Sequence, residues 1–258
     1  MALQSSNNPV FQRSAPLIES LRGAPTAQEV ADVYGAPQRL TVDDIMVKTG
    51  VLLGLMVVTG AAAWALDLSF GVVILAALVG FGLAMVNIFK RQVSPALVLA
   101  YAAVQGIAVG GISHVYENTY SGIVVQAVVG TVAVFAAVAF GYKSGRLRAT
   151  PRFTKVVMFG FVGLFAVLLL NVVVGLFGDG DALGIRGDNV VLSVLFSLAF
   201  ITFGALTFVL DFDQAERMVA AGAPERESWR IAFGLVVGLV WLYLEILRLL
   251  SYLQGGRR

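Results

Sequence analysis

The sequence contains no cysteine and only one histidine, His114, among its 258 residues. Without cysteine there can be no disulfide, thiol nucleophile, thiolate zinc site or iron–sulfur cluster, and one histidine is too few for a histidine metal centre. Charged side chains are also scarce, at 13% of residues, whereas soluble domains have roughly a quarter. The sequence also lacks a phosphate-binding loop, a nucleophile elbow, an HExxH pattern and a dinucleotide fingerprint, so we expect a protein that is not an enzyme.

What is abundant is apolar sequence. Hydrophobic residues make up 58% of the chain and the mean hydropathy is +0.85, which is the composition of a membrane protein. Seven apolar runs are each long enough, at about 20 residues, to cross a bilayer core as a helix. The predicted spans are residues 44–66, 69–90, 95–116, 122–142, 153–177, 189–211 and 229–252. Because several connections are very short, neighbouring helices must be antiparallel. We therefore predict an all-α polytopic membrane protein with seven helices in one bundle; six spans with a re-entrant segment is the competing topology.

Residues 1–43 precede the first span and show no sustained helical or strand periodicity. We interpret them as a loosely ordered cytoplasmic arm, followed by a transmembrane domain at residues 44–258. The arm lacks the basic and then apolar layout of a cleaved signal peptide, so the first span is expected to remain in the mature protein.

Lysines and arginines are distributed unequally between the two sides of the predicted bundle. Twelve lie near the first span and in the loops after spans two, four and six, against only Arg186, Arg257 and Arg258 on the other side. Since cytoplasmic loops carry the excess of basic residues, the N-terminus is predicted to be cytoplasmic and the C-terminus outside. The net charge of +2 and the confinement of basic residues to loops make nucleic-acid binding an unlikely function class.

Small and polar residues recur at helical spacing within several spans. They predict helix interfaces, because helices in lipid associate through close backbone approach and polar contacts. In the last span one face carries Arg230, Gly234, Gly238, Trp241, Glu245, Arg248 and Tyr252. In the sixth the corresponding face carries Ser193, Ser197, Phe200, Gly204, Thr207 and Asp211. Further packing surfaces are predicted at Gly50 and Gly54, and at Ala102, Gly106, Gly110 and Ser113.

Three acids in or beside the last two spans are the candidate functional residues: Asp211, Asp213 and Glu245. A carboxylate at membrane depth is costly and by default marks a functional site. Asp213 lies about 200° around the helix from Asp211, so Asp211 is the predicted inward acid and Asp213 the second choice. We hypothesise that Asp211 and Glu245 face one another across a cytoplasm-facing cavity. Such a pair resists being ionised together, which makes it a pH sensor, and its ionised form offers oxygen ligands to a cation such as Ca²⁺.

Two basic residues are candidate charge partners for these acids. Lys90, at the cytoplasmic end of the second span, is the predicted partner of Asp211. Arg248 follows Glu245 by three residues and lies on the same helical face. A purely structural alternative therefore stays open, in which Glu245 simply pairs with Arg248 and Asp211 simply caps its helix.

The segments VLDFDQAE (209–216) and LYLEILRLLSYL (242–253), joined by a charged hairpin, resemble the paired sixth and seventh helices of a known family. This is the Bax inhibitor-1/YccA family, also called the transmembrane Bax-inhibitor-motif family, and the similarity is greatest to its actinobacterial members with a long N-terminal arm. It extends from about residue 40 to the C-terminus and includes IFKRQVSPALVLAYA (88–102). Two departures are that the second acid of the family is usually Asp, where this chain has Glu245, and that the hairpin is longer here.

The resemblance implies seven helices with the last one central, and a pH-sensitive calcium leak channel in the inner membrane of a bacterium. It assigns the two sensor carboxylates to Asp211 and Glu245 and their basic partner to Lys90. No cofactor is implied other than Ca²⁺ as the bound or transported ion, and a monomer is favoured. The rival interpretation is an interaction protein that restrains a membrane-bound ATP-dependent protease, for which the arm at residues 1–43 would be required.

Overall fold

The computed structural model describes residues 38–177, 185 and 189–255. The chain divides into Met1–Gln38, which lies almost entirely outside those residues, and Arg39–Arg258, which carries all the described helices. Most of the predicted arm, residues 1–43, thus falls outside the described residues. So do Arg186, Arg257 and Arg258, which entered the prediction of orientation.

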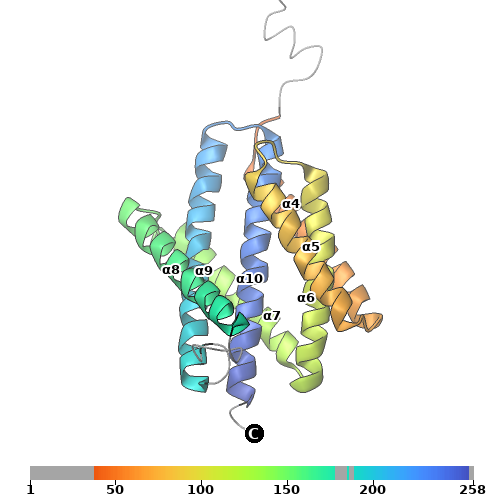
Figure 1. Ribbon diagram of the computed structural model, residues 1–258. Coiled ribbons are helices and arrows are strands. Elements are labelled where there is room, and N and C mark those ends of the chain that lie inside the picture. Colours follow the sequence, from red (N-terminus) through yellow and green to blue (C-terminus); the bar gives the residue numbers. More distant parts are fainter. Residues whose placement is uncertain (1–37, 178–184, 186–188, 256–258) are drawn as a thin grey trace, which may run out of the picture. The chain divides into compact units, whose positions relative to one another are not determined.

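Seven helices in the described part of the chain are long and apolar enough to cross a membrane, and no strand occurs there. This confirms the predicted all-α class and the count of seven spans. The helices are α4 (Val42–Ala65), α5 (Phe70–Phe89), α6 (Pro95–Thr119), α7 (Ile123–Lys143), α8 (Pro151–Leu176), α9 (Val190–Ala220) and α10 (Ser228–Gly255), with a short 3₁₀ turn, η1 (Glu225–Glu227), before α10 (Figure 1).

The helix ends follow local sequence chemistry. Thr41 caps α4, because its hydroxyl accepts from the Asp44 backbone N–H while the Asp44 carboxylate accepts from the backbone N–H of Thr41. Thr150 caps α8 directly before Pro151, a residue suited to a first helical turn. The largest difference from the predicted boundaries is in α9, which continues to Ala220 where the prediction ended at residue 211. Asp211 and Asp213 are therefore inside a helix and cap nothing.

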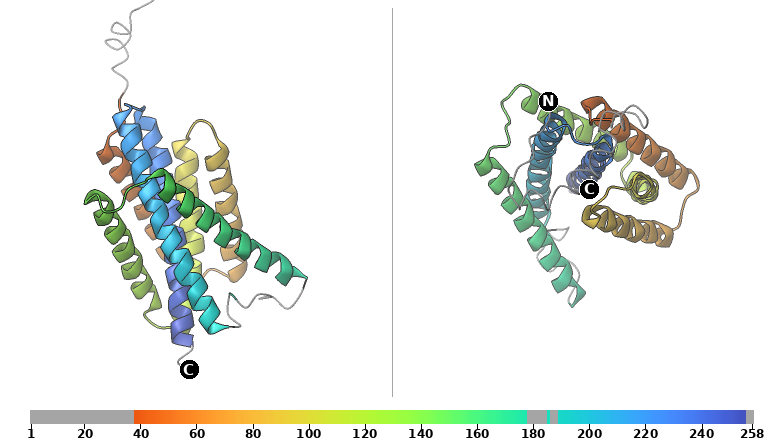
Figure 2. Two further views of the ribbon diagram at one scale, coloured as in Figure 1. Left: turned by 90° about the vertical axis from the view of Figure 1, so that its left-hand side faces the viewer. Right: turned by 90° about the horizontal axis from the view of Figure 1, so that it is seen from above.

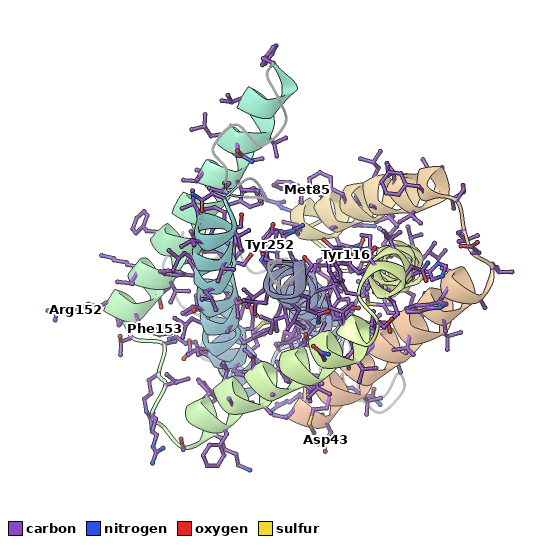
Figure 3. All side chains as sticks on the ribbon, turned by 90° about the horizontal axis from the view of Figure 1, so that it is seen from below. Asp43, Met85, Tyr116, Arg152, Phe153 and Tyr252 are labelled. Carbon is purple, nitrogen blue, oxygen red and sulfur yellow. The ribbon has the colours of Figure 1, made fainter. Side chains whose placement is uncertain are left out.

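The last helix, α10, is the central element. It packs against α4, α6, α7 and α9, whereas α5 packs mainly on α6 and α8 mainly on α9 (Figures 1 and 2). In the apolar stretch of α10 that is long enough to span a membrane, half of the residues are buried, compared with 11% in that of α8. Seen along the bundle, Tyr252 of α10 lies in the middle, while Arg152 and Phe153 at the start of α8 lie at the edge (Figure 3). Residues on α10 are therefore the best placed to control any path through the bundle.

Close packing of small residues joins α4 to α6. Gly60 of α4 lies against Gly106 and Gly110 of α6, so closely that a Cβ on Gly110 would collide with the backbone of Gly60. The stripe of small residues predicted in the third span is thus a helix interface. The predicted packing surface at Gly50 and Gly54 is wrong, because a Cβ at either position would meet no atom within 4 Å. Those two glycines lie on the side of α4 that faces away from its neighbours.

The two glycine positions provide a matched test of this packing. We expect Gly110→Ala to destabilise the protein by about 1–3 kcal/mol, because the added methyl overpacks a contact between two backbones. We expect Gly54→Ala to be neutral or stabilising by up to about 1 kcal/mol, because alanine favours the helix and meets open space. Thermal unfolding of both variants in detergent micelles checks this. Equal effects would contradict the close approach of α4 and α6.

Candidate functional site

Asp211 and Asp213 lie on different faces of α9, as the helical period predicts. Asp213 accepts from Arg217 Nε at 2.8 Å, one turn further along. It lines an open cavity of about 430 Å³ with Thr154 of α8 and residues at the end of α9. Asp211 lines a second cavity with residues of α5 and α10. Asp213 therefore belongs to a surface ion pair beside α8, and Asp211 is the acid directed toward the central helix.

The second cavity has a volume of about 220 Å³ and gathers polar groups from three helices. Its lining residues are Asn87 and Ile88 of α5, Asp211 and Gln214 of α9, and Arg230, Ile231, Phe233 and Gly234 of α10. Lys90, the predicted partner of Asp211, is not among them. It is the exposed C-cap residue of α5, and no ion pair joins it to Asp211. Asn87, one turn earlier on α5, takes the position beside the acid.

Glu245 is the most deeply buried charged group in the described residues, with 2% of its surface exposed. Its Oε1 accepts from Arg248 Nη1 at 2.8 Å, so the predicted pairing within α10 is formed. Arg248 itself is 33% exposed. This ion pair between residues three apart brings a guanidinium to the carboxylate in the middle of the bundle, which compensates the cost of burying the charge.

The structure does not bring Asp211 and Glu245 face to face. Asp211 shares its cavity with Gly234, and Glu245 follows Gly234 by eleven residues on α10, which is about 16 Å of helix rise. The packing of α9 on α10 agrees with this register, because a Cβ on Gly238 would lie 2.8 Å from the ring of Phe208 and one on Gly204 would lie 3.6 Å from Trp241. The predicted joint Ca²⁺ site of Asp211 and Glu245 is therefore wrong in its geometry.

The surroundings of the two acids differ in chemistry. Beside Glu245 the interface of α8, α9 and α10 is aromatic: Trp241 lies 5.5 Å from Phe200 and 6.1 Å from Phe161 between ring centroids. Ser193 and Ser197 of the same α9 face are also buried, as predicted. Where α10 packs on α6, the Tyr243 hydroxyl of α10 shares a 2.6 Å hydrogen bond with the Ser113 hydroxyl of α6. Glu245 thus sits in a dense, largely apolar interior, whereas the cavity that Asp211 lines also contains the side-chain amides of Asn87 and Gln214.

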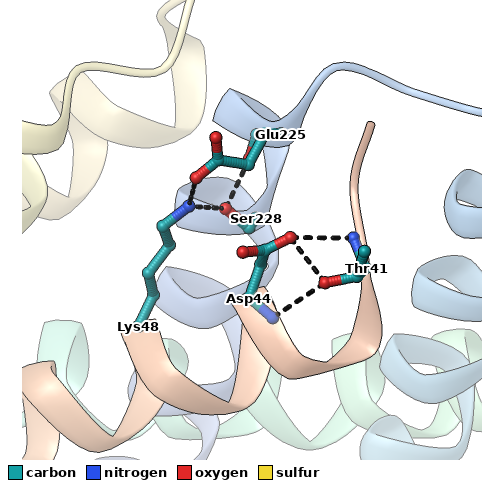
Figure 4. Close-up of polar contacts among 5 residues, drawn as sticks. All are labelled: Thr41, Asp44, Lys48, Glu225 and Ser228. Atoms are coloured by element: carbon teal, nitrogen blue, oxygen red, sulfur yellow. Dashed lines mark hydrogen bonds and ion pairs between the residues drawn. The ribbon is translucent and has the colours of Figure 1, made fainter. Parts of the chain in front are cut away.

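Sequence reasoning missed a polar network that fastens the start of α4 to the hairpin between α9 and α10. Lys48 Nζ donates to Glu225 Oε1 and to Ser228 Oγ, both at 2.6 Å (Figure 4). Just before α4, the backbone N–H of Leu40 donates to the carbonyl of Ala223 at 2.8 Å. The mixture of acidic and basic residues in ERESWR was the only signal of the pairs that they form.

Within the described residues, no group of three or more histidine, aspartate or glutamate side chains could hold a metal ion. Any cation bound near Asp211 would therefore use amide, backbone or water oxygens beside the single carboxylate, which is ligand chemistry suited to Ca²⁺ or Na⁺.

Comparisons with known proteins agree with the resemblance noted from the sequence. The profile of the family described as Bax inhibitor 1 like matches residues 8–255 of this chain. A search of curated proteins found no match.

The Glu245 and Arg248 pair can be tested by a double-mutant cycle. Removing the guanidinium with Arg248→Leu should destabilise the protein by about 1–3 kcal/mol, less than the roughly 3–5 kcal/mol of fully buried pairs, because Arg248 is partly exposed. Arg248→Leu should cost less when Glu245→Gln is already present, because no buried charge is then left behind. Thermal unfolding of both single variants and the double variant measures the coupling; additive effects would contradict a direct ion pair.

Proposed function

We propose that this chain, which belongs to the Bax inhibitor 1 like family, conducts cations across a membrane under the control of proton uptake by Asp211 and Glu245. Ca²⁺ is the first ion to test. The observation that supports this most is the burial of Glu245 in the central helix, at 2% exposure. A carboxylate kept at that depth is costly for stability, and such groups usually serve ion or proton pathways.

In this proposal the two acids act at successive positions along α10. The Asp211 cavity receives the cation, and the Glu245 carboxylate is the next oxygen ligand further along the helix. Arg248 occupies that carboxylate in the described conformation, so the path is closed there. Protonation of Glu245 removes its charge and releases Arg248. Because Ile246 packs against Gly130 of α7, a shift of α10 at this level would also loosen its contact with α7. Conduction through several weak positions, rather than one tight one, allows the ion to leave.

The proposed orientation places the Asp211 cavity on the cytoplasmic side of a bacterial inner membrane. The start of α4, the α5–α6 loop and the α9–α10 hairpin lie at one end of the bundle, since Lys48 contacts Glu225 and Arg230 donates to the Arg91 carbonyl. These segments carry most of the basic residues near the cavity, and basic segments remain in the cytoplasm. With an odd number of spans the C-terminus is on the opposite side. The protease-binding alternative depends on the arm, of which residues 1–37 lie outside the described part.

Ca²⁺ flux into vesicles that contain the purified full-length protein tests the proposal, with flux compared at acidic and alkaline pH. Glu245→Gln, which imitates the protonated acid, should reduce the pH dependence to the part that Asp211 contributes, and Asp211→Asn should lower the flux. In Asp211→Asn, losing a charged contact worth about 1.5–3 kcal/mol corresponds to a decrease in Ca²⁺ flux on the order of 10–100-fold. Asp213→Asn is the matched control and should keep wild-type flux, because Asp213 is paired with Arg217.

Wild-type vesicles without Ca²⁺ flux, or a Glu245→Gln variant with an unchanged pH response, would contradict the proposal. Deletion of residues 1–37 separates it from the alternative, since a channel keeps its flux without the arm whereas a protease-binding protein loses its partner.

A further inference from the structure

The cavity beside Asp211 contains a buried amide oxygen that no described residue satisfies. Asn87 is 7% exposed, and its Nδ2 donates to the carbonyls of Leu83 at 2.9 Å and Leu97 at 3.3 Å. These two acceptors fix the orientation of the amide, because exchanging its nitrogen and oxygen would place oxygen against oxygen. Asn87 Oδ1 is left buried without a hydrogen-bond partner among the described residues. A buried acceptor in this state calls for a ligand or an ordered water.

The other oxygen ligands come from α9. In the described part of the chain, no hydrogen bond or ion pair joins the Asp211 carboxylate to another residue. Gln214 is exposed and lines both this cavity and the one beside Asp213; its Nε2 donates to Met218 Sδ at 3.9 Å, and its Oε1 makes no hydrogen bond within the described residues. Asn87 Oδ1, the Asp211 carboxylate and Gln214 Oε1 are therefore acceptor oxygens without a partner in the described part of the chain, on residues that line one cavity, a set that suits a hard cation.

The geometry points to a binding site for a partly hydrated Ca²⁺ ion, formed by the Asp211 carboxylate and the amide oxygens of Asn87 and Gln214. The three side chains supply at most four oxygens, whereas Ca²⁺ takes 6–8, so water completes the shell. The cavity of about 220 Å³ has room for the ion and its water ligands, since a cavity volume of about 10–15 Å³ is enough for one water. With a single carboxylate, the dissociation constant is on the order of 1 mM, in the range of sites with few charged ligands.

Two features of α10 keep the site open to a cation. Arg230 lines the cavity, but its Nε donates to Glu227 at 2.7 Å and its Nη2 to the carbonyl of Arg91 at 2.7 Å, so its charge is balanced and those N–H groups are directed away from Asp211. Gly234 also lines the cavity, and a Cβ there would meet no atom within 4 Å. The absence of a side chain at residue 234 thus leaves the space that the ion occupies.

This site rests on the proposed function and adds the ligands that first receive the ion. It is separate from the Glu245 and Arg248 pair, which lies about 16 Å further along α10. Binding at the Asp211 cavity can therefore be measured without any flux.

Unfolding temperature of the full-length protein in detergent micelles, titrated with CaCl₂ at constant ionic strength in choline chloride, reports binding because a ligand specific for the folded state stabilises it. We expect Asn87→Leu to weaken the apparent Ca²⁺ affinity at least roughly ten-fold, because it removes the amide oxygen ligand and keeps a side chain of similar size in the helix interface. Gly234→Leu should do the same by filling the cavity. Gln214→Glu should strengthen the affinity roughly ten-fold, since affinity rises with the number of charged ligands. Asp213→Asn is the control and should match the wild type.

Because Gln214 is exposed, the Gln214→Glu variant is expected to fold even if Asn87→Leu and Gly234→Leu do not. Its Ca²⁺ affinity alone then decides whether the site exists. Wild-type Ca²⁺ dependence in Gln214→Glu would overturn the site and leave Asn87 Oδ1 to an ordered water. Loss of the site with intact pH-dependent flux would leave the proposed function standing. Ca²⁺ binding with the expected variant pattern but no flux would support the site and refute the proposed function.

Discussion

The ion pair between Glu245 and Arg248 is the interaction on which the arrangement of this bundle depends. A bilayer interior offers no water to a bare carboxylate, so a charge at the centre of α10 requires a partner supplied by the protein. Arg248 provides it from one turn away on the same helix, and α4, α6, α7 and α9 pack around α10. This explains how α10 can be both the most buried helix and the one that carries a buried acid.

Around that pair, the helices differ in how many neighbours they pack against. α4 and α6 meet backbone to backbone at Gly60, Gly106 and Gly110, and α6 is tied to α10 by the Ser113 and Tyr243 hydrogen bond. α5 and α8 each rest mainly on a single neighbour. The Asp211 cavity lies between α5, α9 and α10, so its volume depends on a helix that packs mainly on α6. Local motion is expected first at elements that pack on few neighbours.

The sequence was sufficient for the fold because apolar runs and short connections are local signals, and each predicted span begins within two residues of the start of a helix. Helical period also separated Asp211 from Asp213 and placed Glu245 beside Arg248. It could not give the axial register between α9 and α10. The helical period reveals which face of its helix a residue occupies. The axial register between two helices depends instead on where each helix ends, and α9 continues nine residues past its predicted end. Lys90 was chosen for its charge, but Asn87, an amide inside an apolar run, was the better signal.

The contacts between the start of α4 and the α9–α10 hairpin also bear on how the chain is assembled. Lys48 and Glu225 are separated by 177 positions, and the Ala223 carbonyl that binds Leu40 is likewise made near the end of synthesis. Lys48 and Leu40 can therefore make these contacts only after the hairpin between α9 and α10 has been synthesised. Contacts of such long sequence separation form late in folding. A chain cut short before the hairpin would lack Glu225, Ser228 and the Ala223 carbonyl, so the start of α4 would have none of these three partners.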